Sequence, residues 1–141
     1  MTPAHVEISS EFDPELDEFL EDRLYEFNVE ATGFADGKAL YVTVTDGSGA
    51  TIAGLAGHTW GGCCELTKLW VHRSQRGRGL GTDLVRAAEQ EATRRGCERI
   101  VLSTHSFQAP LFYEKLGFSK LCSVPGYPKG YEEIIYTKTL V

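Results

Sequence analysis

The chain has 141 residues, 42% of them apolar, and a formal net charge of −6. This length suits one domain around a single core, and we expect residues 1–141 to form it. No apolar run reaches the ~20 residues of a membrane span, and the first residues lack the charged and apolar regions of a signal peptide, so we expect a cytoplasmic protein without a membrane partner.

The first 32 residues are predicted to hold a strand and then an acidic helix. Residues 5–9 alternate between apolar and polar types, as a strand does. Asp13 and Pro14 suit the N-cap and first position of a helix, whose apolar face holds Leu16, Phe19, Leu20, Leu24 and Phe27. Nine acids and one base fall within residues 11–30. This acidic face either contacts solvent or attracts a cationic substrate.

Three strands are predicted next, over residues 38–45, 51–60 and 63–71. The first two form a hairpin, because the residues between them, Asp46-Gly47-Ser48-Gly49, tolerate positive φ. Gly54 and Gly57 interrupt the second strand, which indicates a β-bulge or a close approach of two backbones.

A glycine-rich loop with Gly77, Gly79 and Gly81 follows the third strand and leads into a helix over residues 82–95. The first amides of a helix have no partner within it and carry partial positive charge, so they attract phosphate oxygens. Arg76 and Arg78 add full charges beside these amides. The loop therefore predicts a site for a pyrophosphate. Because the basic cluster is confined to it, we expect no nucleic-acid partner.

Two common nucleotide motifs do not fit this loop. A P-loop needs Gly-Lys followed by Ser or Thr, but the Gly37-Lys38 pair is followed by Ala39. The dinucleotide fingerprint needs glycine where this chain has Thr82 or Leu84, depending on the register.

The remaining elements complete a mixed sheet. A strand over residues 98–104 is expected to lie parallel to strand 63–71, with the helix between them as the crossover. A short helix over residues 108–116 and strands over residues 118–124 and 131–140 follow. The four cysteines have neither disulfide nor zinc spacing, so we expect buried or half-buried thiols and no metal.

Two segments resemble landmarks of the GNAT acetyltransferases. Residues 76–81, Arg-Gly-Arg-Gly-Leu-Gly, are similar to the family's Arg/Gln-x-x-Gly-x-Gly/Ala signature, and residues 112–118, Phe-Tyr-Glu-Lys-Leu-Gly-Phe, are similar to its second motif. The resemblance implies an α+β fold in α/β/α layers, with six to seven strands and three to four helices. It also implies acetyl-CoA as cosubstrate, and dimers are frequent in the family.

The same resemblance implies which residues bind the coenzyme. The glycine loop would hold the pyrophosphate, the backbone of the preceding strand would bind the pantetheine arm, and the segment before Tyr113 would complete the site. Many members have asparagine seven residues before the tyrosine, where this chain has Ser106. The implied set is Leu69, Trp70, Val71, Arg76, Gly77, Arg78, Gly79, Leu80, Gly81, Thr82, Ser106, Ala109 and Tyr113.

Acetyl transfer to an amine requires a proton donor for the departing thiolate and a base for the ammonium. Tyr113 resembles the family tyrosine placed near the coenzyme sulfur. Glu65 lies eleven residues before Arg76, the offset of the base in histone acetyltransferases of the family. Strand alternation places its side chain on the face of Thr67, Leu69 and Val71. The rival bases are His58, His72 and His105.

The resulting hypothesis is an N-acetyltransferase acting by direct attack in a ternary complex. The acceptor would be a primary amine of a small cationic metabolite, an antibiotic or a peptide. Two alternatives stay open: a module that binds acetyl-CoA without turnover, and an acyltransferase that uses another acyl-CoA or a hydroxyl acceptor.

Overall fold

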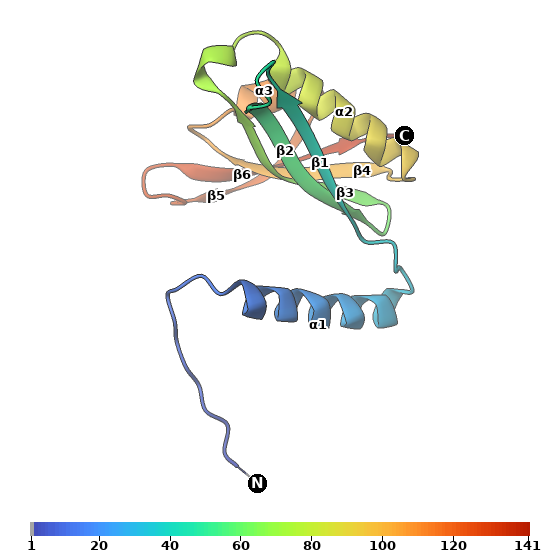
Figure 1. Ribbon diagram of the computed structural model, residues 1–141, viewed down its shortest axis with the longest axis vertical. Helices are drawn as coiled ribbons and strands as arrows, with labels where there is room; N and C mark the ends of the chain where they lie inside the picture. The colour runs from blue at the N-terminus through green and yellow to red at the C-terminus, as the bar shows by residue number, and fades with distance from the viewer. Residues whose placement is uncertain (1) are drawn as a thin grey trace. The chain divides into compact units, whose positions relative to one another are not determined.

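The computed structural model describes residues 2–141 (Figure 1). The chain divides into two units, one ending at Phe34 and the other spanning Ala35–Val141. None of the described helices is both long enough and apolar enough to cross a membrane.

Residues 2–34 of the first unit contain a single helix, α1 (Pro14–Thr32). The Asp13 side chain accepts a hydrogen bond from the Leu16 amide (3.0 Å) at its start, and Gly33 ends it in the left-handed conformation with φ +79°. The strand predicted over residues 5–9 is wrong, since these residues have no regular structure. A strand is stable only when a neighbouring strand shares its hydrogen bonds, and the described part of this unit contains no strand to do so.

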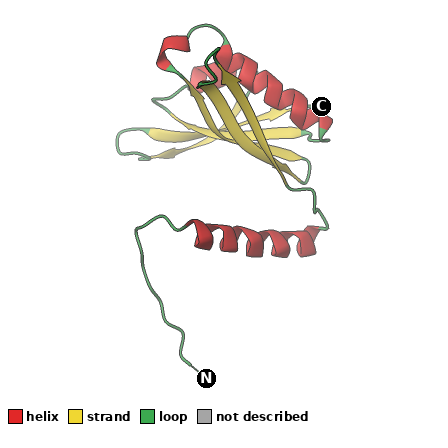
Figure 2. Cartoon of the chain, in the orientation of Figure 1, coloured by secondary structure: helices red, strands yellow, loops and turns green. Residues whose placement is uncertain are grey.

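The second unit is built on six strands, drawn in yellow in Figure 2: β1 (Lys38–Thr45), β2 (Thr51–Trp60), β3 (Cys63–Val71), β4 (Arg99–His105), β5 (Ser119–Pro125) and β6 (Glu132–Thr139). They form one sheet in the order β1-β2-β3-β4-β6-β5. Only β3 and β4 pair in parallel; the other neighbours are antiparallel. The six strands and the three α-helices of residues 2–141 match the expected GNAT fold.

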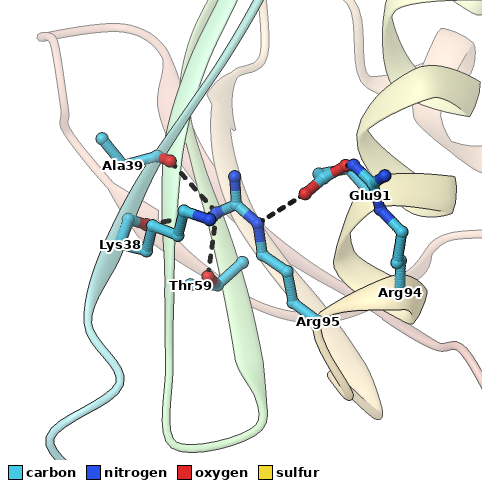
Figure 3. Close-up of polar contacts among 6 residues, drawn as sticks. All are labelled: Lys38, Ala39, Thr59, Glu91, Arg94 and Arg95. Atoms are coloured by element: carbon cyan, nitrogen blue, oxygen red, sulfur yellow. Dashed lines mark hydrogen bonds and ion pairs between the residues drawn. The ribbon is translucent and has the colours of Figure 1, made fainter.

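Helix α2 (Leu80–Arg94) connects the two parallel strands and contacts β1, β2 and β3. Its buried face is made of Leu84, Val85, Ala88 and Ala92, as the helical periodicity predicts. Arg95, just after the helix, hydrogen-bonds to the hairpin of β1 and β2 (Figure 3). A short helix, α3 (Pro110–Lys115), follows β4, and a 3₁₀ turn, η1 (Arg73–Gln75), precedes the glycine loop.

A β-bulge interrupts the pairing of β2 with β3, between Ala56 and Gly57. Thr67 is the extra residue on β3, and its hydroxyl donates to the Ala56 carbonyl (3.2 Å). A Cβ at Gly57 would collide with the Glu65 carbonyl oxygen. The sequence indication of a bulge or close approach is therefore confirmed at Gly57.

The parallel strands separate after a short paired stretch. Residues 63–66 of β3 pair with residues 99–102 of β4, but β3 continues to Val71 and β4 to His105 without pairing with each other. The two strands thus leave an opening in the sheet at their carboxyl ends, where open α/β sheets bind ligands.

Candidate active site

A cavity of about 950 Å³ lies where β3 and β4 separate. Its walls come from four places: residues 66–71 of β3, the glycine loop with the start of α2, residues 102–104 of β4, and the segment from Phe107 to Tyr113. Parts of the chain that are distant in sequence thus meet around one space.

The amino-terminal end of α2 forms one wall of this cavity. Gly79 is the N-cap residue with φ +83°, and no side chain caps the helix. The first helical hydrogen bond runs from the Asp83 amide to the Gly79 carbonyl (3.0 Å), so the amides of Leu80, Gly81 and Thr82 have no acceptor inside the helix. All three residues line the cavity. This end of α2 is suited to bind an anion.

The two arginines of the loop differ in position. Arg76 lines the cavity, and its Nε donates to the Val71 carbonyl (3.1 Å), which fixes the guanidinium at the end of β3. Arg78 is outside the cavity lining, and its Nη1 lies 3.4 Å from Oε1 of Gln75. Arg76 is therefore the guanidinium placed to neutralise a bound anion.

The backbone of β3 presents polar groups to the opening in the sheet. The His72 amide donates to the Ile52 carbonyl (2.7 Å), so it points towards β2. Trp70, two residues earlier and paired with Gly54, presents its backbone groups to the same edge. Because the backbone groups of successive residues point to opposite edges, those of Leu69 and Val71 face away from β2, towards the opening. Both residues line the cavity.

Tyr113 lies on α3 and lines the cavity. Its ring is buried and makes edge contacts with Phe112 and Phe118, with centroids 5.0 and 5.9 Å apart. Burial raises the pKa of the Tyr113 phenol above its ordinary value of 10.0, because the phenolate would lose its hydration. The hydroxyl therefore keeps its proton at neutral pH.

Glu65 does not share a face of β3 with Leu69 and Val71, so the face predicted for its side chain is wrong. The extra residue Thr67 shifts the alternation by one: Leu66 and Leu69 are turned towards the core, whereas Glu65 and Lys68 are exposed. Glu65 lies outside the cavity lining, opposite His58 on β2, in the paired stretch just before β3 and β4 separate.

Two of the rival histidines have defined partners. The His72 Nδ1 accepts from the Ser74 amide (3.1 Å) and caps η1. The His105 Nδ1 lies 3.1 Å from the Tyr127 carbonyl oxygen. A carbonyl can only accept, so Nδ1 of His105 carries the proton and a neutral ring keeps a lone pair on Nε2. His105 is thus chemically able to act as a base.

Ser106 is turned away from the cavity and joins β4 to β6. Its amide donates to the Glu132 carbonyl (2.8 Å), and its hydroxyl accepts from the Glu132 amide (3.1 Å). The next residues, Phe107 and Gln108, line the cavity instead. Oε1 of Gln108 accepts from the His105 amide (2.7 Å) and the Thr104 hydroxyl (3.2 Å). Sequence reasoning singled out neither residue, because nothing in their local pattern indicates a site.

Most of the residues predicted to bind the coenzyme surround this one cavity, whereas Arg78 and Ser106 do not line it. The residues that line it are Leu69, Trp70, Val71, Arg76, Gly77, Gly79, Leu80, Gly81, Thr82, Ala109 and Tyr113.

The chain matches the acetyltransferase (GNAT) family over residues 4–118. It is 32% identical to acetyltransferase Atu2258 of Agrobacterium fabrum over 117 residues, 83% of this chain and 85% of the relative. It is 36% identical to the blasticidin-S acetyltransferase of Streptomyces morookaense over 103 residues, 72% of this chain and 76% of the relative.

Solved structures agree with these sequence matches. The crystal structure of an acetyltransferase from Bacillus cereus superimposes with a TM-score of 0.81 at 26% identity, over 96% of this chain and 97% of that one. An Agrobacterium tumefaciens protein superimposes with a TM-score of 0.88 at 29% identity, over 96% and 99% of the two chains. The chain therefore belongs to the GNAT family of acetyltransferases and is an acyltransferase enzyme.

Proposed function

We propose that this enzyme transfers the acetyl group of acetyl-CoA to a primary amine by direct attack in a ternary complex. One observation carries the proposal: a single cavity reaches from the uncapped amides of α2, between the separated ends of β3 and β4, to the Tyr113 ring. Acetyl-CoA has an anionic diphosphate, an arm with amide groups and a reactive thioester, and this cavity offers a partner for each.

The diphosphate would bind at the amino-terminal end of α2. The amides of Leu80, Gly81 and Thr82 supply donors without helical acceptors, and Arg76 supplies a full positive charge. The left-handed conformations of Gly77 (φ +79°) and Gly79 (φ +83°) set the path of the loop.

The pantetheine arm would lie along the edge of β3 that faces away from β2. Its amides are matched to the backbone groups of Leu69 and Val71, as in the addition of a short strand. One of these groups, the Val71 carbonyl, already accepts from Arg76, so the remaining contacts come from the Leu69 backbone and the Val71 amide.

When bound, acetyl-CoA supplies an activated acetyl thioester. Tyr113 would donate a hydrogen bond or a proton to the departing sulfur, since burial keeps its phenol protonated. We assign the base to Glu65, which lies just before the point where β3 and β4 separate. Since its side chain is exposed and outside the cavity lining, it would take the proton through water. His105 is the competing base, and pH profiles of the Glu65→Gln and His105→Gln variants distinguish the two.

For the acceptor we propose a small cationic metabolite, an antibiotic or a peptide. The acid-rich segment of residues 11–30 favours a cation by long-range attraction. The relative named for acetylation of blasticidin S supports an antibiotic. The family match at residues 4–118 includes most of α1's unit as well as the glycine loop, which supports one functional domain over residues 1–141.

Mass spectrometry of an amine panel tests the proposal. The purified enzyme is incubated with acetyl-CoA and with blasticidin S, an aminoglycoside, small diamines or peptides with free amino termini, and each product is examined for one added acetyl group. Tyr113→Phe should abolish most of the product. Tyr136→Phe is the matched control, because Tyr136 is also a buried tyrosine but lies outside the cavity lining.

Two results would replace the proposal by its alternatives. Tight acetyl-CoA binding without a product from any amine would indicate a module that binds the coenzyme without turnover. Faster transfer from a longer acyl-CoA would indicate that the enzyme uses another acyl donor at the same site.

A further inference from the structure

Four aromatic side chains form a chain of ring contacts that reaches the cavity at Phe107: His105, Phe107, Tyr127 and Tyr131. The His105 and Phe107 rings are stacked, with centroids 5.4 Å apart and planes 2° from parallel. Tyr127 meets the edge of His105 at 5.0 Å, and Tyr131 meets the edge of Phe107 at 5.1 Å. We call these four residues the aromatic cluster.

Hydrogen bonds hold the aromatic cluster in place before any ligand binds. The His105 ring lies within 3.1 Å of the Tyr127 carbonyl, and its backbone amide donates to Gln108. The loop carrying both tyrosines is closed by the Gly126 amide, which donates to the Tyr131 carbonyl (2.9 Å), and the Tyr131 amide donates to the Pro128 carbonyl (2.9 Å). The rings therefore form a preorganised surface, which lowers the entropic cost of binding.

The aromatic cluster is exposed although its rings contact one another. Phe107, Tyr127 and Tyr131 keep 55%, 54% and 52% of their surface accessible. Their stacked and edge-on contacts leave large apolar areas open, a pattern more typical of a binding surface than of isolated surface residues.

Phe107 connects the aromatic cluster to the site of the proposed reaction, since it lines the cavity and contacts both His105 and Tyr131. Glu133 pairs directly with His105 across β4 and β6, so the two side chains share a face of the sheet. A carboxylate beside exposed rings favours a ligand that combines a positive charge with a flat apolar group.

We propose that the aromatic cluster binds a planar ring of the acceptor, so that this enzyme acts on amines that carry an aromatic or heteroaromatic ring. This inference rests on the proposed function, because it assigns the acceptor end of the same cavity. The ring stacks on the aromatic cluster while the amine extends into the cavity, towards the space beside Tyr113.

A matched pair of amines tests the inference. 2-Phenylethylamine and 2-cyclohexylethylamine have the same carbon skeleton, but only the first has a flat ring. We expect kcat/KM to favour the phenyl compound about five-fold, the ratio that an aromatic pair contributes beyond its buried area. We expect Tyr131→Leu to reduce this ratio to about one, whereas Tyr41→Leu, at an exposed tyrosine of the edge strand β1, leaves it unchanged.

Binding measurements separate this inference from the proposed function. Saturation-transfer NMR with coenzyme A present reports on ring binding without requiring turnover, and calorimetry reports on acetyl-CoA. If acetyl-CoA binds but the wild type shows no preference for the phenyl ring by NMR or kinetics, the aromatic cluster is not the acceptor site. The same conclusion follows if Tyr131→Leu lowers stability but keeps the phenyl preference, because the aromatic cluster then only packs the loop against β4.

Discussion

The Arg95 guanidinium lies 3.0 Å from the Ala39 carbonyl oxygen, joining the end of α2 to the first strand of the sheet (Figure 3). The same Nη1 donates to the Thr59 hydroxyl (3.0 Å), and Nε donates to Glu91 (2.8 Å). Arg95 is thus largely buried and hydrogen-bonded through Nη1 and Nε, at the end of α2 away from the glycine loop. It fixes the helix whose first amides form the proposed coenzyme site.

Replacing Arg95 with Met should therefore lower the free energy of unfolding by about 2 kcal/mol, because charged hydrogen bonds are lost and the buried Thr59 hydroxyl loses its donor. Urea unfolding followed by circular dichroism measures this. Arg94→Met is the control: Arg94 also pairs with Glu91 but is 77% exposed, so its loss should cost less than about 0.5 kcal/mol. Equal effects in the two variants would contradict the role of Arg95.

Gly79→Ala should weaken acetyl-CoA binding roughly ten-fold, the loss expected when one or two charge-assisted hydrogen bonds are displaced. Gly79 has φ +83°, and nothing lies within 4 Å of an added Cβ, so the strain is purely conformational. Gly96→Ala is the matched control, with φ +84° and open space at the other end of α2. Both variants should lose about 1 kcal/mol of stability, but calorimetry should show weaker acetyl-CoA binding only for Gly79→Ala.

The glycine loop could be predicted because the residues that define it are consecutive in the sequence. A strand, glycines able to adopt positive φ, and an amphipathic helix lie consecutively, and the Tyr113 motif is equally continuous. The face of Glu65 could not be predicted, because Thr67 becomes an extra residue only when β3 pairs with β2. The contacts of Arg95 could not be predicted either, because its partners Lys38 and Ala39 lie 57 and 56 positions away in the chain.

The bulge makes a prediction about Gly57. An added Cβ would collide with the Glu65 carbonyl and lie 3.2 Å from the Leu66 Cα, whereas at Gly54 the nearest atom is 3.7 Å away. Gly57→Ala should cost about 2 kcal/mol or more, because backbone atoms must move, and Gly54→Ala should be nearly neutral. Thermal unfolding compares them. If Gly57→Ala is as stable as the wild type, the close approach of β2 and β3 is wrong.

The buried phenol of Tyr113 predicts a particular pH dependence of turnover. Its pKa is raised above 10.0 by burial, so the protonated donor persists at least to that pH. Tyr113→Phe should lower kcat roughly 100-fold at every pH up to about 10, without adding or removing a titration in that range. A wild-type decline centred near pH 8 or 9 that disappears in Tyr113→Phe would contradict this argument.

The thiol of Cys64 predicts how stability changes in alkali. Cys64 is fully buried, and burial raises its pKa from 9.0 to about 12. Above pH 9 the unfolded chain loses this proton while the folded chain keeps it. The contribution of Cys64 to the free energy of unfolding is therefore fully present below pH 9 and is lost as the pH rises towards about 12. Urea unfolding at pH 10 should show about 1 kcal/mol less stability than at pH 7, after correction with a Cys64→Ala variant. Cys122→Ala, at an exposed thiol, should leave this difference unchanged; if it removes the difference instead, the alkaline loss comes from another group.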